Sequence, residues 1–438
     1  MPFMLGRLGR LVVFCSAVLS SQGRCPEPDF ANDVLVVLRT GATEALEKLP
    51  VHFNTTLRCA PNYVIYSDLE EDIQGYHIYD VLDEVEDGTK NNIEDFEIYR
   101  HLHEQGRQGL DEEALSRISA PNGAGNTDNP GWRLDKWKFL PMVSKALNHD
   151  PDAKWFVFLE PDTYIIWSNL LEYLTHLDAS KPYYLGRHMY IGDTIFGYGG
   201  AGFAISNPAM RMVTQHWTDH MIEYNDLIEV HWAGDCVLGK TLMDAGVPLT
   251  YAWPHFQDMR PSTFDHATWK THRVAWCFPA VTYHHVPAEE ALTFAAFENN
   301  WFREHNGPIR HRDVFRHYIL PQLRNEKENW DNLANDVVYV GDTKIPNGKD
   351  PRKMKGQIER DAPKSFESCR ALCQSQKSCL QFKYTDGKCF VSKYALLGQK
   401  TAAESGELEV KSGWMFERAK TWADKMDRTC GHKLWFAP

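Results

Sequence analysis

The stretch Trp155-Phe156-Val157-Phe158-Leu159-Glu160-Pro161-Asp162-Thr163-Tyr164 contains the strongest strand signal in the chain. Its first five residues are a continuous apolar run, which is typical of a strand buried on both faces of a parallel sheet. Glu160 and Asp162 follow at once, and ligands of open α/β sheets bind just beyond the carboxyl ends of the strands. The stretch therefore predicts a buried strand that ends at a ligand site, with a solvated turn as the alternative.

Two more apolar runs, Val34–Leu38 and Tyr63–Tyr66, predict further strands of this sheet. Residues 134–147 and 170–177 have the apolar spacing of helices on either side of the central strand. A stretch rich in Gly, Asn and Pro, 121–130, predicts a loop before the first of these helices. The alternation of strands and helices predicts a doubly wound α/β domain with a mostly parallel sheet.

Composition and charge narrow the class of protein. The 438 residues carry a net charge of -12, which provides no basic surface for nucleic acid. Two arginines and a short apolar run at 7–19 indicate a secretory signal, either cleaved or kept as a short anchor. Ten cysteines and a glycosylation sequon at Asn54 agree with an oxidising compartment. We expect a signal at 1–23, a main domain at 24–330, a linker at 331–360 and a cysteine-rich module at 361–438.

A metal site is the chemistry that best suits the carboxylates after the central strand. Hard divalent cations such as Mg²⁺ or Mn²⁺ take oxygen ligands and share them with substrate phosphates. Asp162 would be the direct ligand, and Glu160 a second ligand or an outer partner of it. His284 and His285 are further candidates; neighbours on a strand point to opposite faces, so at most one would serve the site. A structural, hydrogen-bonded histidine is the alternative for this pair.

Two other motifs are chemically suggestive. The glycines of Gly197–Gly202 permit a sharp bend or a close approach to a ligand, but their spacing matches neither a Walker loop nor a dinucleotide fingerprint. Asp235 opens a helical pattern, where it is either a helix cap or a general base for an acceptor hydroxyl.

The order of these features resembles the inverting glycosyltransferase family 31, which contains Fringe and the core 1 β1,3-galactosyltransferases. The resemblance rests on 132–137, 155–164, 197–206, 234–235 and 281–286. It implies a GT-A type fold, a nucleotide-binding α/β sandwich with a mostly parallel sheet. The family's Asp-x-Asp metal motif stands here as Glu160-Pro161-Asp162, so Glu160 replaces an aspartate.

The resemblance also implies roles for individual residues. Asp235 matches the catalytic base, and His284 matches a metal ligand beside Asp162 and Glu160. The positions that match nucleotide-sugar contacts are Arg39, Thr40, Asp68, Lys136, Gly200, Ala201 and Gly202.

The cysteine-rich C-terminal region resembles a PAN/apple module, a small α+β fold held by disulfides. That resemblance implies bridges Cys369–Cys389 and Cys373–Cys379, and a glycan or a protein as the ligand of the module. In the main domain we expect Cys25–Cys59 and Cys236–Cys277, which leaves Cys430 without a partner.

Together these features predict an inverting glycosyltransferase that depends on Mn²⁺ or Mg²⁺. It would move a hexose (galactose or N-acetylhexosamine, in a β1,3 linkage) from a UDP-sugar to a glycan or glycoprotein. The expected place is the Golgi lumen or membrane, with secretion as the second choice. The alternatives are a metal-dependent hydrolase and a decayed transferase that binds carbohydrate or protein.

Overall fold

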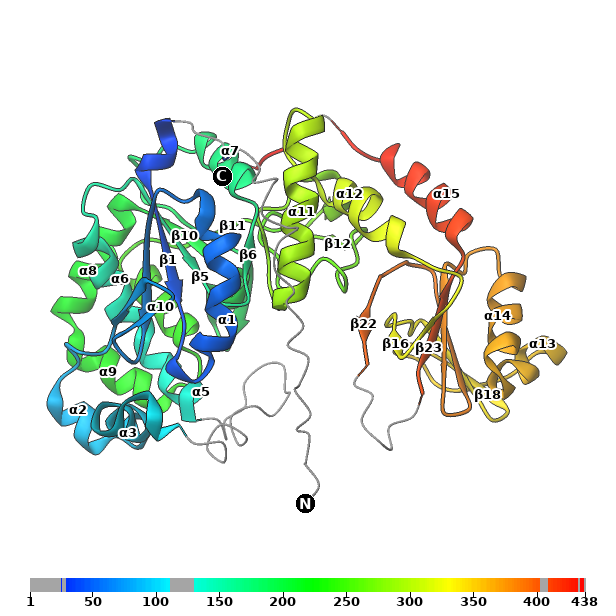
Figure 1. The fold of residues 1–438 in the computed structure, drawn as a ribbon, viewed down its shortest axis with the longest axis horizontal. Coiled ribbons are helices and arrows are strands. Elements are labelled where there is room, and N and C mark those ends of the chain that lie inside the picture. Colours follow the sequence, from blue (N-terminus) through cyan, green and yellow to red (C-terminus); the bar gives the residue numbers. More distant parts are fainter. Residues whose placement is uncertain (1–24, 26–28, 111–129, 402–408, 432–433, 437–438) are drawn as a thin grey trace, which may run out of the picture.

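The structure is a computed structural model that describes residues 25, 29–110, 130–401, 409–431 and 434–436. The expected signal at 1–23 and all but the last residue of the expected loop at 121–130 lie outside the described residues. Figure 1 shows an α/β domain joined through a mostly helical region to a smaller C-terminal domain with its own sheet. Among the described residues, no helix combines the length and apolar character needed to cross a membrane.

An eight-stranded sheet forms the α/β domain, in the order β11-β7-β10-β5-β1-β2-β4-β3. The predicted strands are its centre: β1 pairs in parallel with β2 and with β5, so that Val36 lies opposite both Tyr63 and Val157. β10 runs antiparallel between β5 and β7. The bounds are β1 Val34–Arg39, β2 Asn62–Ser67, β3 Glu71–Ile73, β4 Tyr76–Asp80, β5 Trp155–Leu159, β7 Tyr184–Gly186, β10 Phe203–Ser206 and β11 Leu249–Tyr251.

Helices cover both faces of this sheet, which explains why its central strands are apolar along their whole length. Alternate side chains of β1 and β5 belong to two separate cores: one packs against α3, α6, α8 and α10, the other against α1 and α7. The expected mostly parallel α/β fold is therefore confirmed, and it agrees with a GT-A-like fold. The helices are α1 Ala42–Asn54, α2 Asp87–Asn92, α3 Glu97–Gln105, α5 Pro130–Asp135, α6 Phe139–His149, α7 Trp167–Thr175, α8 Asn207–Asp219, α9 Met221–Val230 and α10 Gly234–Asp244.

A third core joins the α/β domain to the C-terminal domain. It contains Tyr164, Tyr283 and Phe294 from the middle region and Trp414 from the C-terminal sheet. The short strand β14 pairs antiparallel with β6, which follows the end of β5 and so anchors this region at the carboxyl edge of the main sheet. The bounds are β6 Tyr164–Ile165, β8 His188–Ile191, β9 Thr194–Gly197, β12 Trp269–Lys270, β13 Arg273–Val274, β14 Thr282–Tyr283, α11 Ala288–Glu304 and α12 His311–Val314.

The C-terminal domain has an antiparallel seven-stranded sheet, in the order β15-β23-β20-β21-β17-β18-β19. Helices α13 and α14 pack beside it, and α15 returns to the middle region (Figure 1). The bounds are β15 Lys327–Glu328, β16 Trp330–Asp331, β17 Val337–Val340, β18 Thr343–Pro346, β19 Arg352–Lys353, β20 Gln381–Thr385, β21 Lys388–Ser392, β22 Gln399–Lys400, β23 Lys411–Trp414, α13 Gly356–Asp361, α14 Phe366–Ser375 and α15 Phe416–Asp427.

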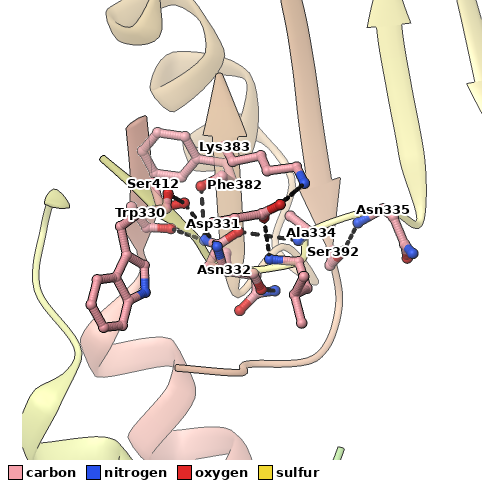
Figure 2. Close-up of polar contacts among 12 residues, drawn as sticks. Trp330, Asp331, Asn332, Ala334, Asn335, Phe382, Lys383, Ser392 and Ser412 are labelled. Carbon is pink, nitrogen blue, oxygen red and sulfur yellow. Dashed lines mark hydrogen bonds and ion pairs between the residues drawn. The ribbon is translucent and has the colours of Figure 1, made fainter. Parts of the chain in front are cut away.

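The expected linker at 331–360 is wrong, because this segment supplies three strands to the C-terminal sheet. Figure 2 shows how its beginning is fixed. Asp331 pairs with the Lys383 ammonium at 2.7 Å, and the buried Asn332 amide nitrogen donates to the Phe382 carbonyl at 3.0 Å. The Asn332 backbone amide donates to the Ser412 hydroxyl at 3.0 Å. Polar composition suggested a solvated joint, but these polar groups are paired with the sheet.

Four disulfides lie among the described residues. Cys25–Cys59, Cys369–Cys389 and Cys373–Cys379 join the residues that we expected to pair. The expected Cys236–Cys277 bridge is wrong: Cys277 pairs with Cys430, and Cys236 is a buried free thiol. Cys277–Cys430 ties the middle region to the end of the chain, a contact that spacing in the sequence does not reveal.

Candidate active site

Carboxylate and imidazole groups meet at the carboxyl edge of the main sheet. Asp162 follows β5, and the pairing of β14 with β6 places His284 beside it. The His284 Nε2 atom lies 3.1 Å from Asp162 Oδ1 and 3.4 Å from Glu160 Oε2. These three residues, predicted from separate motifs, are therefore neighbours.

The fourth member of this group, His285, departs from the expected strand geometry. Its backbone is left-handed, with φ of 57°, and its ring lies beside that of His284 with centroids 3.7 Å apart. Its Nδ1 atom is 3.6 Å from Asp162 Oδ2. Asp162, His284 and His285 each offer a ligand atom, and these atoms all lie within 4.8 Å of one another. Strand β14 ends at Tyr283, so the alternation expected of neighbours on a strand does not apply to this pair, and both rings lie beside Asp162.

The charges of this group suit a divalent cation. Burial would raise the pKa of Asp162, but the hydrogen bond and charge of His284 hold that pKa well below its ordinary value. Burial would lower the pKa of His284, yet the hydrogen bonds and charges of Asp162 and Glu160 raise it to about 9. A proton on His284 thus balances two carboxylates, and a bound cation would replace that proton. One oxygen and two nitrogen donors fit Mn²⁺ or Zn²⁺ better than Ca²⁺.

Glu160 connects this group to the end of β1. Its Oε1 atom accepts from the Arg39 guanidinium at 2.5 Å, and the same guanidinium pairs with Asp135. Arg39 is buried and lies over the Phe139 ring at 4.1 Å. Its charge keeps the pKa of Glu160 below the ordinary value despite burial. Glu160 is therefore an outer partner of the Asp162 group that is already engaged by Arg39.

The ends of β1 and β2 carry a second buried ion pair. The Lys138 ammonium lies 2.9 Å from Asp68 Oδ2 and donates to the Thr40 carbonyl at 2.9 Å. Asp68 also accepts from the Ala42 backbone amide at 2.7 Å, at the start of α1. The Thr40 hydroxyl is buried and has no hydrogen-bond partner within the described part of the chain. Arg39, Thr40 and Asp68 are thus close together, as their positions after neighbouring strands predict.

Lys136 does not belong to this group. Its ammonium lies 2.9 Å from Asp95 and donates to the Glu229 carbonyl at 3.0 Å, which directs it toward α9. Lys138, two residues later, is the lysine that reaches Asp68. Sequence reasoning missed Lys138 and Asp135 because both lie in a pattern that reads as a plain amphipathic helix.

The glycine-rich stretch forms a buried turn beneath His284. A side chain at Gly200 would place its Cβ 2.1 Å from His284 Cε1, so the ring lies directly on the backbone. The Gly200 carbonyl accepts from the Thr163 hydroxyl at 2.7 Å, and that of Ala201 accepts from Thr282 at 2.5 Å. Gly202 has a φ of 74°, in the left-handed region. Gly200, Ala201 and Gly202 thus support the histidine through packing and hydrogen bonds.

Asp235, in the first turn of α10, contacts the same glycine turn at Gly199. Its Oδ2 accepts from the Gly199 amide at 2.9 Å and its Oδ1 from the Cys236 amide at 2.9 Å. Burial raises its pKa to about 6, with the charge of Glu160 acting in the same direction. The helix cap is Ala233, so Asp235 is not the capping residue. It is a carboxylate poised to change protonation near neutral pH.

One family model matches a range that begins in the α/β domain and ends in the middle region. Residues 138–319 match the family model described as Fringe-like, a range that includes Glu160, Asp162, Asp235 and His284. This part of the chain is similar to Fringe-like proteins, in agreement with the resemblance to the family that contains Fringe.

Two curated relatives share part of the chain. The Beta-1,3-glucosyltransferase of Mus musculus is 32% identical over 129 residues, and that of Homo sapiens is 30% identical over 129 residues. The two alignments each cover 28% of this chain, and 25% and 24% of the respective relatives. The chain therefore matches about a quarter of the length of these relatives. The resemblance of the C-terminal region to a PAN/apple module stays a prediction.

Proposed function

We propose that the protein is an inverting, metal-dependent glycosyltransferase that moves a hexose from a UDP-sugar to a hydroxyl group of a glycan or glycoprotein. One observation carries the proposal: a candidate base, Asp235, and a candidate metal group, Asp162 with His284 and His285, contact one glycine turn, the first at Gly199 and the second at Gly200. Transfer needs both, one to activate the acceptor and one to neutralise the leaving diphosphate.

The proposed metal site consists of Asp162, His284 and His285, with Glu160 as the outer partner. A bound Mn²⁺ or Mg²⁺ would neutralise negative charge on the diphosphate of the donor. Arg39, Thr40, Asp68 and Lys138 lie where a nucleotide would bind, beyond the ends of β1 and β2.

Asp235 takes the proton from the attacking hydroxyl as the acceptor oxygen bonds to the anomeric carbon and the diphosphate leaves. A single displacement inverts that carbon, so that an α-linked donor gives a β-glycoside. The names of the relatives make UDP-glucose and a β1,3 linkage the first donor and product to test, followed by galactose and N-acetylhexosamine.

The secretory pathway is the proposed location, since four disulfides need an oxidising compartment. Golgi residence, membrane anchoring and glycosylation of the exposed Asn54 belong to the same proposal.

Calorimetry and product analysis test the proposed function. UDP should bind in the presence of Mn²⁺, lose affinity in EDTA, and fail to bind Asp162→Ala. Asp235→Asn should keep UDP binding while transfer falls by about 10³-fold, within the range for loss of a general base. UDP-sugar consumption that is equal with and without an acceptor would indicate a hydrolase instead. Absence of UDP binding under every condition would favour a decayed transferase.

A further inference from the structure

An exposed stack of aromatic rings lies next to Asp235 in the chain. The Trp232 ring stacks on Trp132, with centroids 6.1 Å apart and planes at 22°, and on His231 at 6.3 Å and 13°. Trp232 is 55% exposed, whereas most other tryptophans of the α/β domain are buried. A large indole held flat and open to solvent has the form of a binding surface.

The backbone fixes this stack against the site. His231, Trp232 and Ala233 form the turn between α9 and α10, where the Ala233 amide donates to His231 Nδ1 at 3.0 Å. A side chain at Gly234 would place its Cβ 2.7 Å from the Lys136 carbonyl oxygen, so this turn lies directly on the segment that carries Trp132. The Lys136 ammonium also donates to the Glu229 carbonyl at 3.0 Å. The two tryptophans are therefore brought together by backbone packing.

Exposed apolar side chains also lie on elements that adjoin the turn between α9 and α10. Tyr190, on the β8–β9 hairpin, is 67% exposed, and Val230, two residues before Trp232, is 82% exposed. Ile191 of the same hairpin packs against the small core that contains Ala233. The elements next to this turn thus expose apolar side chains as well as the Trp232 ring.

The charges around the stack favour a neutral ligand. The nearest lysine, Lys136, is paired with Asp95 at 2.9 Å, so its charge is already balanced. Cationic groups that could face a phosphate lie instead at Arg39 and Lys138, near the ends of β1 and β2. A pyranose ring has an apolar C–H face that covers an indole and hydroxyl groups at its edge that bind carboxylates.

We infer that Trp232, stacked on Trp132, is the platform for a pyranose ring of the acceptor, with one hydroxyl group of that sugar directed toward Asp235. Trp232 precedes Asp235 by three positions, which limits the distance between their Cα atoms to about 11 Å. The inference rests on the proposed function, because it takes Asp235 as the base that activates the acceptor hydroxyl group. It adds the class of acceptor and the residues that recognise it.

Saturation-transfer NMR of the full chain with a panel of methyl glycosides tests this inference. The methyl glycosides of glucose, galactose, fucose, mannose and N-acetylglucosamine serve as probes, in the presence of UDP and Mn²⁺. At least one should receive saturation at its ring C–H protons. Trp232→Ala should weaken that binding about tenfold, and Trp232→Phe should restore part of it. Ile222→Ala, which removes an 80% exposed side chain from α9, is the control and should bind as the wild type does.

Donor binding separates this inference from the proposed function. UDP affinity should be equal in the wild type and Trp232→Ala, which also shows that the variant is folded. If the wild type binds no UDP, the proposed function fails, while the loss of glycoside binding in Trp232→Ala still supports the stack. Equal glycoside binding by both proteins, or none by the wild type, overturns the inference. Binding to phosphatidylserine vesicles that depends on Trp232, with sugars unaffected, overturns it in favour of a membrane contact.

Discussion

At the scale of single residues, Asp235 combines burial with two backbone hydrogen bonds. Burial raises its pKa to about 6, while the Gly199 and Cys236 amides moderate the rise. A base is active when it is unprotonated, so transfer should fall about tenfold per pH unit below pH 6 and be level above it. Rates at saturating Mn²⁺ and donor measure this profile. The residual rate of Asp235→Asn should not fall in this way below pH 6. A fall that persists in this variant would assign the titration to another group.

His285 is the residue of the metal group that the sequence assigned least securely. Its side chain is 48% exposed, against 3% for His284, so in the proposed site it would offer one ligand without supporting the fold. His285→Ala should lower Mn²⁺ affinity about tenfold, with little change in thermal stability. Calorimetry with Mn²⁺ alone measures the effect. His149→Ala, which removes a histidine at the end of α6, is the control. Equal Mn²⁺ affinity in His285→Ala and the wild type would exclude His285 as a ligand.

At the scale of elements, the turn at 199–201 determines where His284 lies. In Gly200→Ala the new methyl group would meet the imidazole ring, because its Cβ would be 2.1 Å from Cε1. We expect a loss of about 1–3 kcal/mol in stability and a larger loss of Mn²⁺ affinity, since the ring must move. Thermal melting and calorimetry measure the two effects. Gly88→Ala on α2 is the control, because no atom lies closer than 3.8 Å to the Cβ it would add; it should change neither stability nor Mn²⁺ affinity. Unchanged Mn²⁺ affinity in Gly200→Ala would show that the turn does not position His284.

The central elements of the fold could be predicted because their signals are local. Continuous apolar runs identified β1, β2 and β5, and the carboxyl edge of that sheet then located Asp162 and Asp68. His285 could not be placed, because it lies beyond the end of β14 with a left-handed backbone that no sequence period indicates. Lys136 and Lys138 differ by two positions in one helical stretch, and only packing shows which of them faces β1. The strands at 337–353 were missed because they are only two to four residues long and lie in a segment rich in Gly, Pro and Lys, so they carry little periodicity.

At the scale of the whole molecule, the end of the chain is fastened to the α/β domain. Trp435 stacks on Tyr173 of α7 and donates to Glu172 at 2.8 Å, while Cys430 is bonded to Cys277. The C-terminal domain is thus held at both of its ends, which a tethered binding module would not need.

The Cys277–Cys430 bridge should therefore stabilise the whole chain. It spans a separation of 153 residues, against 6 for Cys373–Cys379. Loop entropy gives about 5 kcal/mol for the longer loop and about 2 kcal/mol for the shorter. Replacing both cysteines of the longer bridge with serine should lower the thermal midpoint more than replacing both of the shorter. Equal shifts would show that the longer bridge closes a contact that forms without it.

Three buried histidines make the joint between the domains sensitive to acid. Burial lowers the pKa of His255 and His266 to about 3 and that of His311 to about 4. In the unfolded chain they bind protons near pH 6.5, so between pH 6.5 and 4 the unfolded state takes up more protons than the folded state. Stability should fall as the pH falls through this window, by about 2 kcal/mol per histidine at pH 5. Urea unfolding at pH 7 and pH 5 measures the change.

His266→Phe isolates one of these contributions, because His266 lies among aromatic rings, with Phe264 at 5.2 Å and Phe315 at 6.1 Å. Between pH 7 and pH 5, the free energy of unfolding of the variant should fall by about 2 kcal/mol less than that of the wild type. Buried carboxylates act in the opposite direction: burial raises the pKa of Glu298 to about 7, so its protonation favours the folded state as the pH falls. That contribution is the same in both proteins and cancels in the difference. An identical pH dependence in the variant would mean that His266 is already protonated when folded, and that acid acts on the protein elsewhere.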